Sequence, residues 1–379
     1  MIPIAIPLLD KEEADAAREA VLSGWVSQGP QVAAFEREFA ALVGAPHACA
    51  VSNCTTALHV ALTAANIGPG DEVITASHSF IATANCIKYC GATPVFVDID
   101  PDSYNIDPDR VAEAITSRTR AIVAVHQMGM PCDLAALAAF ADRHGLILIE
   151  DAACAAGSEV RVNGHWERIG KPHGRIACFS FHPRKVITTG EGGMLTTADA
   201  ELDRKFRLLR QHGMSVPDTV RHGSAQVIFE DYLMVGFNYR MTDIQASVGR
   251  KQLERLSELV ARRRSLASRY TELLGNIEGL ILPFEPQWAR SNWQSYCVRL
   301  PDGVDQKVLM QRFLDQGIAT RRGIMCAHRE RPYSNDKRPH DLRQSELAQD
   351  HSILLPLYAQ MTEENQVLIA ETLKKELQV

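Results

Sequence analysis

Short, mostly apolar runs alternate with stretches of helical spacing through the first half of the chain. Strands are expected at residues 48–51, 72–75, 93–98, 121–125 and 146–149. Helices are expected around them, at residues 31–43, 55–65, 107–115 and 133–143. Strands that are apolar on both faces and alternate with helices predict a mostly parallel sheet covered by helices on each side. The predicted fold class is therefore α/β.

The second half of the chain is more helical. Helices are expected at residues 201–212, about 242–274 and 307–316, with one further strand at 295–300. The long run from residue 242 is expected to link a large domain, residues 1–245, to a smaller C-terminal α+β domain, residues 246–379. A chain of 379 residues, of which 46% are hydrophobic, can bury about three quarters of its unfolded surface.

The charge and the cysteines of the chain argue against several classes of protein. The formal net charge is −6 and neither sign forms a long block, which argues against nucleic acid as a partner. The nine cysteines include no C-x-x-C pair, so we expect reduced thiols in a cytoplasm, with neither disulfides nor a metal site. The first residues do not resemble a signal peptide and no run approaches a membrane span, so no membrane partner is expected.

Lys185 lies on a turn between two short apolar strands, predicted at residues 176–179 and 194–197. Glycines follow it within residues 190–193, where they allow a close approach of the backbone. Most loop lysines are simply solvated. A lysine beside Phe181 is instead expected to be partly out of water, with a lowered pKa, and such an amine is a nucleophile for carbonyl carbon.

Asp151 stands just past the apolar strand predicted at residues 146–149. Ligands of open parallel sheets collect at this edge, and the mostly small residues 152–157 leave room for a flat ring. A carboxylate there suits the ring nitrogen of pyridoxal phosphate, although an acid at a strand end also serves as a helix cap or meets solvent. Together with Lys185, Asp151 indicates a Schiff-base site more specifically than either residue alone.

A strand, a turn and a helix meet near Ser52 and Thr55. Free amides and the positive end of a helix dipole make such a turn suitable for a phosphate group. Serine and threonine also begin many helices as plain caps, so the residues alone leave both interpretations open.

These segments resemble the DegT/StrS-type sugar aminotransferases, a fold-type-I family that uses pyridoxal phosphate and aminates keto sugars attached to nucleotides. The resemblance continues through residues 52–58, 80–85 and 236–243, and more loosely 355–357, so it covers nearly the whole chain in the family's order. It implies a fold-type-I α/β architecture with a smaller C-terminal domain.

The resemblance also implies roles for individual residues. Lys185 would carry pyridoxal phosphate and Asp151 would face its ring nitrogen. The other implied cofactor contacts are Thr55, Thr56 and Ser180 at the phosphate, Phe80 stacked on the ring, Cys154 near the phenolic oxygen, and Asn238 at the phosphate of a partner subunit. A contact from Asn238 implies a homodimer with shared sites. The implied substrate contacts are Trp25, His182, Arg321, Arg322 and His328.

The sequence leaves several alternatives open. Trp25 and Phe80 are equally compatible with the core, and surface arginines are usually only solvated. Cys154 stands where many relatives carry glutamine or histidine. The expected reaction moves an amino group from an amino acid, with glutamate implied, to a nucleotide-linked keto sugar. The alternatives are a keto-cyclitol acceptor, a related sugar dehydratase, in which histidine replaces the lysine, and a non-catalytic relative.

Overall fold

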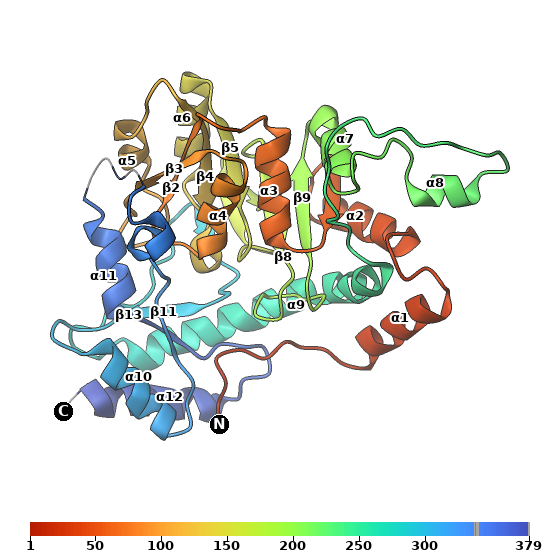
Figure 1. Cartoon of the computed structure of the whole chain (residues 1–379). Coiled ribbons are helices and arrows are strands. Elements are labelled where there is room, and N and C mark those ends of the chain that lie inside the picture. The colour runs from red at the N-terminus through yellow and green to blue at the C-terminus, as the bar shows by residue number, and fades with distance from the viewer. Residues whose placement is uncertain (337, 339–340, 378–379) are drawn as a thin grey trace.

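A seven-stranded sheet forms the centre of the fold (Figure 1). The computed structural model describes residues 1–336, 338 and 341–377. The strands of this sheet are β1 (His47–Val51), β2 (Glu72–Ala76), β3 (Thr93–Val97), β4 (Thr119–Val125), β5 (Ile147–Asp151), β8 (Ile176–Ser180) and β9 (Gly193–Thr197). They lie in the order β1-β9-β8-β5-β4-β2-β3. Strand β9 runs antiparallel to β1 and β8, and the other neighbouring pairs are parallel. The predicted mostly parallel sheet is confirmed.

The described residues form the helices α1 (Lys11–Leu22), α2 (Pro30–Val43), α3 (Cys54–Ala64), α4 (Ile81–Tyr89), α5 (Pro108–Glu113), α6 (Leu134–His144), α7 (Ala200–Leu209), α8 (Asp218–Gly223), α9 (Asp243–Leu274), α10 (Gln306–Asp315), α11 (Arg343–His351) and α12 (Glu363–Leu377). Of these, α2, α5, α6 and α9 contribute to the core on one face of the sheet, and α3, α4 and α7 contribute to the core on the other face. No helix in the described part of the chain is long and apolar enough to cross a membrane.

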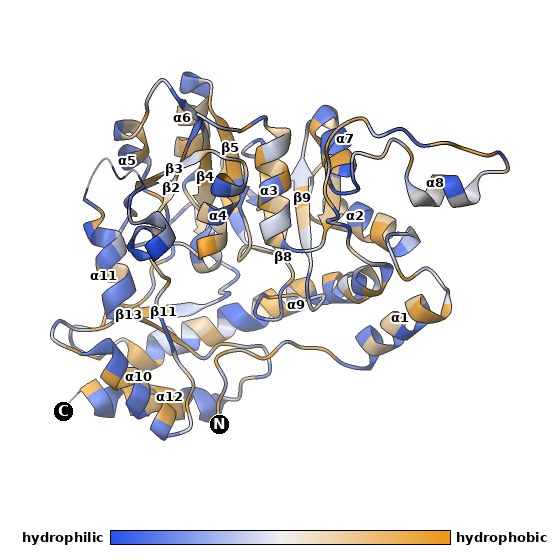
Figure 2. Cartoon of the chain, viewed as in Figure 1, coloured by the Kyte–Doolittle hydropathy of each residue, from blue (hydrophilic) through white to orange (hydrophobic). Residues whose placement is uncertain are grey.

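Side chains alternate between two hydrophobic cores along each central strand. Ala50 and Ile122 join the core under α2, α6 and α9, whereas Val51 and Val123 join the core under α3, α4 and α7. This alternation follows from the period of two of a β-strand. The strands appear as a hydrophobic layer between helices whose outer faces are polar (Figure 2). An apolar residue is therefore needed at nearly every position, as the sequence pattern predicted.

Two small sheets complete the structure. The first contains β6 (Glu159–Val162), β7 (His165–Arg168) and β10 (Ala289–Arg290), and the second contains β11 (Tyr296–Arg299), β12 (Arg321–Arg322) and β13 (Ser352–Leu355). Three short 3₁₀ turns are η1 (Gln127–Gly129), η2 (Ala327–Arg329) and η3 (Arg331–Tyr333). The sequence does not predict the β6–β7 hairpin, because its residues are mostly half-buried or exposed and show no apolar alternation.

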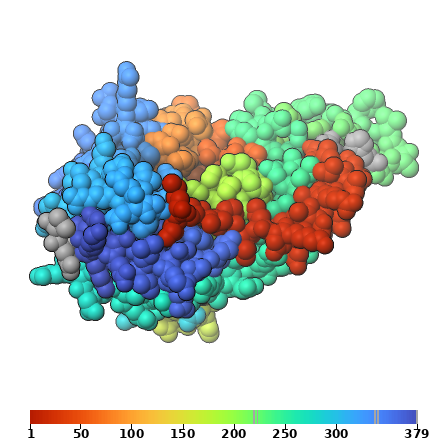
Figure 3. All heavy atoms as spheres, turned by 90° about the horizontal axis from the view of Figure 1, so that it is seen from below, coloured from red at the N-terminus to blue at the C-terminus, as the bar shows by residue number. Residues whose placement is uncertain are grey.

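Helix α9 belongs to two cores. Leu253 and Leu256 pack in the core of the large sheet, whereas Leu266 and Tyr270 pack with α10, α12 and the β11-β13-β12 sheet. The N-terminus also reaches this second core: the Ile2 amide donates to the Gly317 carbonyl at 2.7 Å. From below, the N-terminal segment lies against C-terminal elements (Figure 3). The boundary predicted at residue 245 thus falls at the start of a helix that both parts of the chain share.

Glu36 forms a buried clasp around the β1 edge of the sheet. It is 5% exposed on α2, and its carboxylate accepts from Arg207 of α7, from Arg210 directly after α7, and from the Ala50 amide. Burial alone would raise the pKa of Glu36, but the charges of Arg210 and Arg207 hold it below its ordinary value. The clasp therefore joins helices on opposite faces of the sheet through one ionised carboxylate.

Glu36→Gln is expected to lower the free energy of unfolding by about 3–5 kcal/mol at pH 7, because it leaves the buried guanidinium group of Arg210 without its counter-charge. Urea denaturation measures this loss. The pKa of Glu36 is lowered in the folded state, so its contribution is present at neutral pH and fades as the pH falls through the acid range. The control is Glu38→Gln, which breaks a more exposed pair with Arg250 and is expected to cost under about 1 kcal/mol. Equal losses in the two variants would contradict the buried clasp.

Candidate active site

A cavity of about 600 Å³ opens beyond the ends of strands β4, β5 and β8. Residues of the small β11-β13-β12 sheet and the segment before it close its other side. Of the residues expected from the sequence, those on its lining are Thr55, Phe80, Asp151, Cys154, Ser180, His182, Lys185 and Arg321. Those that lie off this lining are Trp25, Thr56, Asn238, Arg322 and His328. The fold thus gathers most of the expected residues from distant parts of the chain.

Lys185 is carried by the loop between β8 and β9. Phe181 anchors this loop, because its fully buried ring lies 5.2 Å from the ring of Phe35 and 5.7 Å from that of Phe39. The Phe181 amide donates to the Gly192 carbonyl at 2.9 Å, which closes the base of the loop. Lys185 is half-buried, and its amine donates to the Cys154 sulfur at 3.1 Å. A rigid base thus holds the amine inside the cavity.

The charge state of Lys185 differs from our expectation. Burial lowers its pKa, but the Cys154 sulfur and the Asp151 carboxylate raise it by more, so the pKa of Lys185 lies above its ordinary value. The predicted lowering was wrong because the sequence did not show which acidic groups would surround the amine. A lysine in this state is an ammonium group that needs to lose a proton before it acts as a nucleophile.

Asp151 is the last residue of β5 and is 5% exposed. One carboxylate oxygen accepts from the Thr83 hydroxyl at 2.8 Å, and the other accepts from the Ala153 amide at 3.2 Å. Burial raises the pKa of Asp151, whereas these two hydrogen bonds and the Lys185 charge act against the rise. The carboxylate is therefore fixed in position, and it forms no ion pair within the described part of the chain. The protonated ring nitrogen of pyridoxal phosphate would supply a cation for this carboxylate.

Helix α3 begins at the cavity wall. Its first amides, those of Cys54 and Thr55, have no acceptor within the helix and suit an anion. Thr55 lines the cavity, whereas the Thr56 hydroxyl donates to the Asn53 carbonyl at 2.7 Å in a capping box. Only the first of the two threonines thus faces the space where a phosphate would lie. Ser180 lines the same cavity from the end of β8.

Gly193 permits the close approach of β9 to the start of α3. A β-carbon on this residue would lie 2.4 Å from the Asn53 carbonyl oxygen and 2.8 Å from the Cys54 nitrogen. No side chain fits there without moving the helix start. The glycine-rich turn after Lys185 therefore has a steric reason, which the sequence alone did not specify.

Three further residues were expected to contact the cofactor or the substrate, and each lies in a different environment. Phe80 is 68% exposed at the cavity, so it is not a core residue. Trp25 packs against Gly29 in the α1–α2 turn. His328 is buried, with one ring nitrogen 2.6 Å from the Ser77 hydroxyl and the other 3.0 Å from Glu346. Both nitrogens are thus engaged within the fold, and the geometry gives no support to the expected contact between His328 and the sugar.

The cavity also contains residues that the sequence analysis did not select. Arg184 precedes Lys185, and that adjacency was the available signal. Glu191, Gln294 and Ser295 also line the cavity. Gln294 and Ser295 come from the C-terminal part of the chain, and no local pattern marks them, because their place in the site depends on how the two parts pack.

Comparison with known proteins identifies the family of this chain. The sequence profile of the DegT/DnrJ/EryC1/StrS aminotransferase family matches residues 7–374. This chain belongs to that family. It is therefore a pyridoxal-phosphate-dependent aminotransferase, as the resemblance in the sequence predicted.

Individual relatives agree with this assignment. The chain is 43% identical over 318 residues to the spore coat polysaccharide biosynthesis protein SpsC of Bacillus subtilis (strain 168), covering 83% of this chain and 80% of SpsC. Among solved structures, the aminotransferase TlmJ from Streptoalloteichus hindustanus is 33% identical with a TM-score of 0.91, covering 100% of this chain and 99% of TlmJ. The PLP form of Spr1654 from Streptococcus pneumoniae is 26% identical with a TM-score of 0.91, covering 100% of this chain and 98% of that one.

The residues of this family member fit pyridoxal phosphate. A buried carboxylate that forms no ion pair among the described residues, a half-buried amine and the start of a helix face one cavity. The close packing at Gly193 keeps that helix start in place. These features supply partners for the ring nitrogen, the carbonyl carbon and the phosphate of the cofactor.

Thr83→Val is expected to weaken the binding of pyridoxal phosphate about tenfold, because it removes a hydrogen bond to a charged carboxylate and lets the pKa of Asp151 rise further. Absorbance titration of the apoprotein measures the affinity. The matched control is Thr75→Val, which removes a buried hydroxyl that donates to the Val123 carbonyl and does not touch Asp151. The control is expected to lose stability but keep its affinity. Unchanged affinity in Thr83→Val would contradict a positioning role for Thr83.

Proposed function

We propose that this aminotransferase moves an amino group from an amino acid, with glutamate as the first donor to test, to a keto sugar carried on a nucleotide. The observation that carries the proposal is the presence of Lys185 and Asp151 on one cavity. The sugar acceptor is supported by the similarity to SpsC, whose name assigns it to polysaccharide biosynthesis. The product would be an amino sugar nucleotide.

Several residues of the cavity have a specific role in this proposal. Pyridoxal phosphate, when bound, supplies a reactive carbonyl carbon and a ring that accepts electrons. Lys185 would hold the cofactor and, once released, move a proton from the donor's α-carbon. Asp151 would keep a proton on the ring nitrogen, and Phe80 would stack on the ring. Thr55, Ser180 and the start of α3 would hold the phosphate.

Cys154 would tune the amine rather than transfer protons. Its sulfur is the Lys185 contact that raises the lysine pKa, and a thiol is only a weak hydrogen-bond donor. Arg321 and His182 line the cavity where the substrate would enter. We also place the reaction in the cytoplasm, because all nine cysteines are free thiols.

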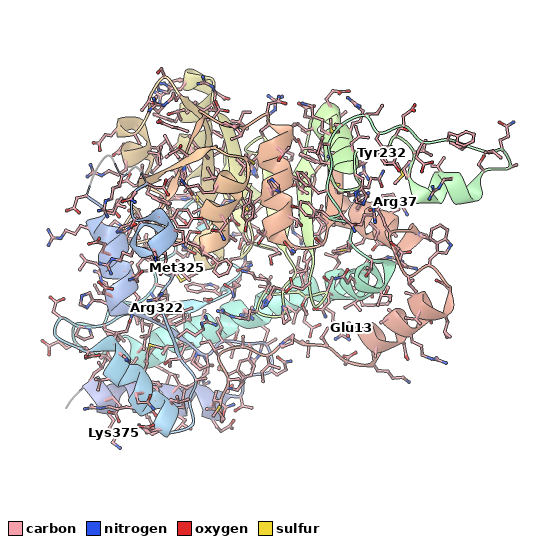
Figure 4. All side chains as sticks on the ribbon, in the orientation of Figure 1. Glu13, Arg37, Tyr232, Arg322, Met325 and Lys375 are labelled. Atoms are coloured by element: carbon pink, nitrogen blue, oxygen red, sulfur yellow. The ribbon has the colours of Figure 1, made fainter. Side chains whose placement is uncertain are left out.

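We further propose that the enzyme is a homodimer with shared sites. The arm, residues 215–235, projects from the body around α8 (Figure 1). It exposes apolar side chains that a monomer would leave in water: Val227, Phe229, Tyr232, Leu233 and Val235. Tyr232 lies where the arm leaves the body (Figure 4). Asn238 follows the arm, is exposed and lies off its own cavity, as a residue that reaches a partner would.

The wild-type protein with bound cofactor is expected to be yellow and to bleach when glutamate is added, because the amino group passes to the cofactor. Lys185→Ala is expected to lose both the protein-linked colour and turnover, by at least about a thousandfold in rate. Visible absorbance and mass spectrometry measure these changes. Cys154→Ala is expected to stay yellow and to retain turnover with a shifted pH profile. A yellow wild type that ignores every amino donor would favour the dehydratase or non-catalytic alternative.

Shared sites are tested by mixing subunits. Lys185→Ala and Asn238→Ala chains, co-expressed with different tags and purified over both, are expected to show about half of the wild-type turnover per dimer, because one of the two sites contains neither substitution. Each variant alone is expected to be impaired. If the mixed dimer is no better than Asn238→Ala alone, Asn238 acts within its own chain or not at all.

A further inference from the structure

Two arginines from distant parts of the chain line the cavity. Arg184 lies on the β8–β9 loop beside Lys185, and Arg321 is the first residue of β12. Among the residues that the structure describes, neither forms an ion pair with an acid. Arg322 differs, because it lies 3.9 Å from Glu330 and is off the cavity lining. The cavity therefore contains two guanidinium groups whose charge the fold does not balance.

The environment of Arg184 shows the same imbalance. Its Nε atom is buried and has no hydrogen-bond partner in the described part of the chain. Burial lowers the pKa of Arg184, and the positive charge of Arg321 lowers it further, while the Cys154 sulfur acts in the opposite direction. The two positive charges therefore lie close enough to repel each other. An anion bound between them would relieve both the repulsion and the unpaired donor.

A chain of hydrogen bonds fixes the backbone of Arg184 next to the reacting groups. Gln294 Nε2 donates to the Arg184 carbonyl at 2.9 Å, and the Gln294 amide donates to Asn292 Oδ1 at 2.9 Å. Asn292 Nδ2 in turn donates to the carbonyls of Cys154 at 2.8 Å and Ala156 at 2.9 Å. The Cys154 sulfur contacts the Lys185 amine. Because Arg184 and Lys185 are adjacent and both line the cavity, an anion held by Arg184 would lie close to the carbon that reacts with Lys185.

The chemistry of the reactants identifies that anion. The cofactor phosphate already has donors at the start of α3 and at Ser180. The diphosphate of a sugar nucleotide is separated from the keto carbon by the sugar ring. An amino donor carries its carboxylate on the same carbon as its amine, so this anion must lie next to Lys185. Guanidinium groups bind carboxylates in a planar, bidentate geometry.

We propose that Arg184 and Arg321 bind the carboxylate of the amino donor. The identity of this ligand rests on the proposed aminotransferase function, whereas the anion site itself rests on the two unpaired arginines. Since Arg321 belongs to the C-terminal sheet and Arg184 to the lysine loop, the bound carboxylate also joins the two walls of the cavity. The arginines thereby orient the donor amine toward the reacting centre.

The first test is the binding of glutarate, a dicarboxylate without an amine, to the cofactor-loaded enzyme by isothermal titration calorimetry. Arg184→Gln and Arg321→Gln are each expected to raise the Kd for glutarate about tenfold or more, because each removes hydrogen bonds to a charged group. Arg184→Lys should fall between Arg184→Gln and wild type. The matched control is Arg322→Gln, the neighbouring arginine on β12 (Figure 4), which should bind glutarate like the wild type. Failure of the wild type to bind glutarate, or equal affinity in all variants, would overturn the proposal.

The second test separates the sources of the anion. In single-turnover mixing with glutamate, Arg184→Gln should raise the apparent Kd for glutamate but leave that for 4-aminobutyrate, which lacks the α-carboxylate, unchanged. The Kd for a nucleoside diphosphate and the Kd for pyridoxal phosphate should not move. A rise in either of these, with glutarate binding intact, would assign the arginines to the acceptor or the cofactor and overturn the proposal. If no donor bleaches the wild type, the proposed function fails, while glutarate binding still decides the carboxylate site.

Discussion

The parallel pairing of β5 with β8 is the constraint on which the active site depends. Its register places Asp151 opposite Cys178, two residues before the strand end at Ser180. Adjacent strand residues point to opposite faces, so a slip of one residue would exchange Asp151 for Glu150. Glu150 lies on the other face, where it accepts from the Gly174 amide at 2.7 Å and contacts His126 at 3.0 Å. The register thus decides which of two neighbouring acids faces the cavity.

Packing converts this register into a rigid site. Phe181 is inserted among the aromatic rings of α2, so the Lys185 loop has a core anchor although it lies between strands. Gly193 allows β9 to touch the start of α3, which brings the amides that we propose hold the phosphate to the same wall. Because these contacts are steric, the amine and the helix start keep their relative positions before any ligand arrives.

The charges of the cavity suit the two anionic reactants of the proposed first half-reaction. The cavity is lined by three basic residues, Lys185, Arg184 and Arg321, and by two acidic residues, the buried Asp151 and the loop residue Glu191. The cofactor phosphate would meet the amides at the start of α3, whereas the donor carboxylate would meet the two arginines. This separation explains how a single cavity can hold two anions without direct repulsion between them.

The sequence by itself determined the alternation of strands and helices, because apolar periodicity reports burial locally. It also predicted roles for Lys185 and Asp151, because each follows a recognisable strand within a family pattern. Tertiary packing decided what local patterns cannot contain. It paired His328 with Ser77 across 251 residues and raised the lysine pKa. It also brought Arg184 and Arg321 to one cavity. The sequence does not predict this proximity, because the two residues lie far apart along the chain and in different parts of the fold.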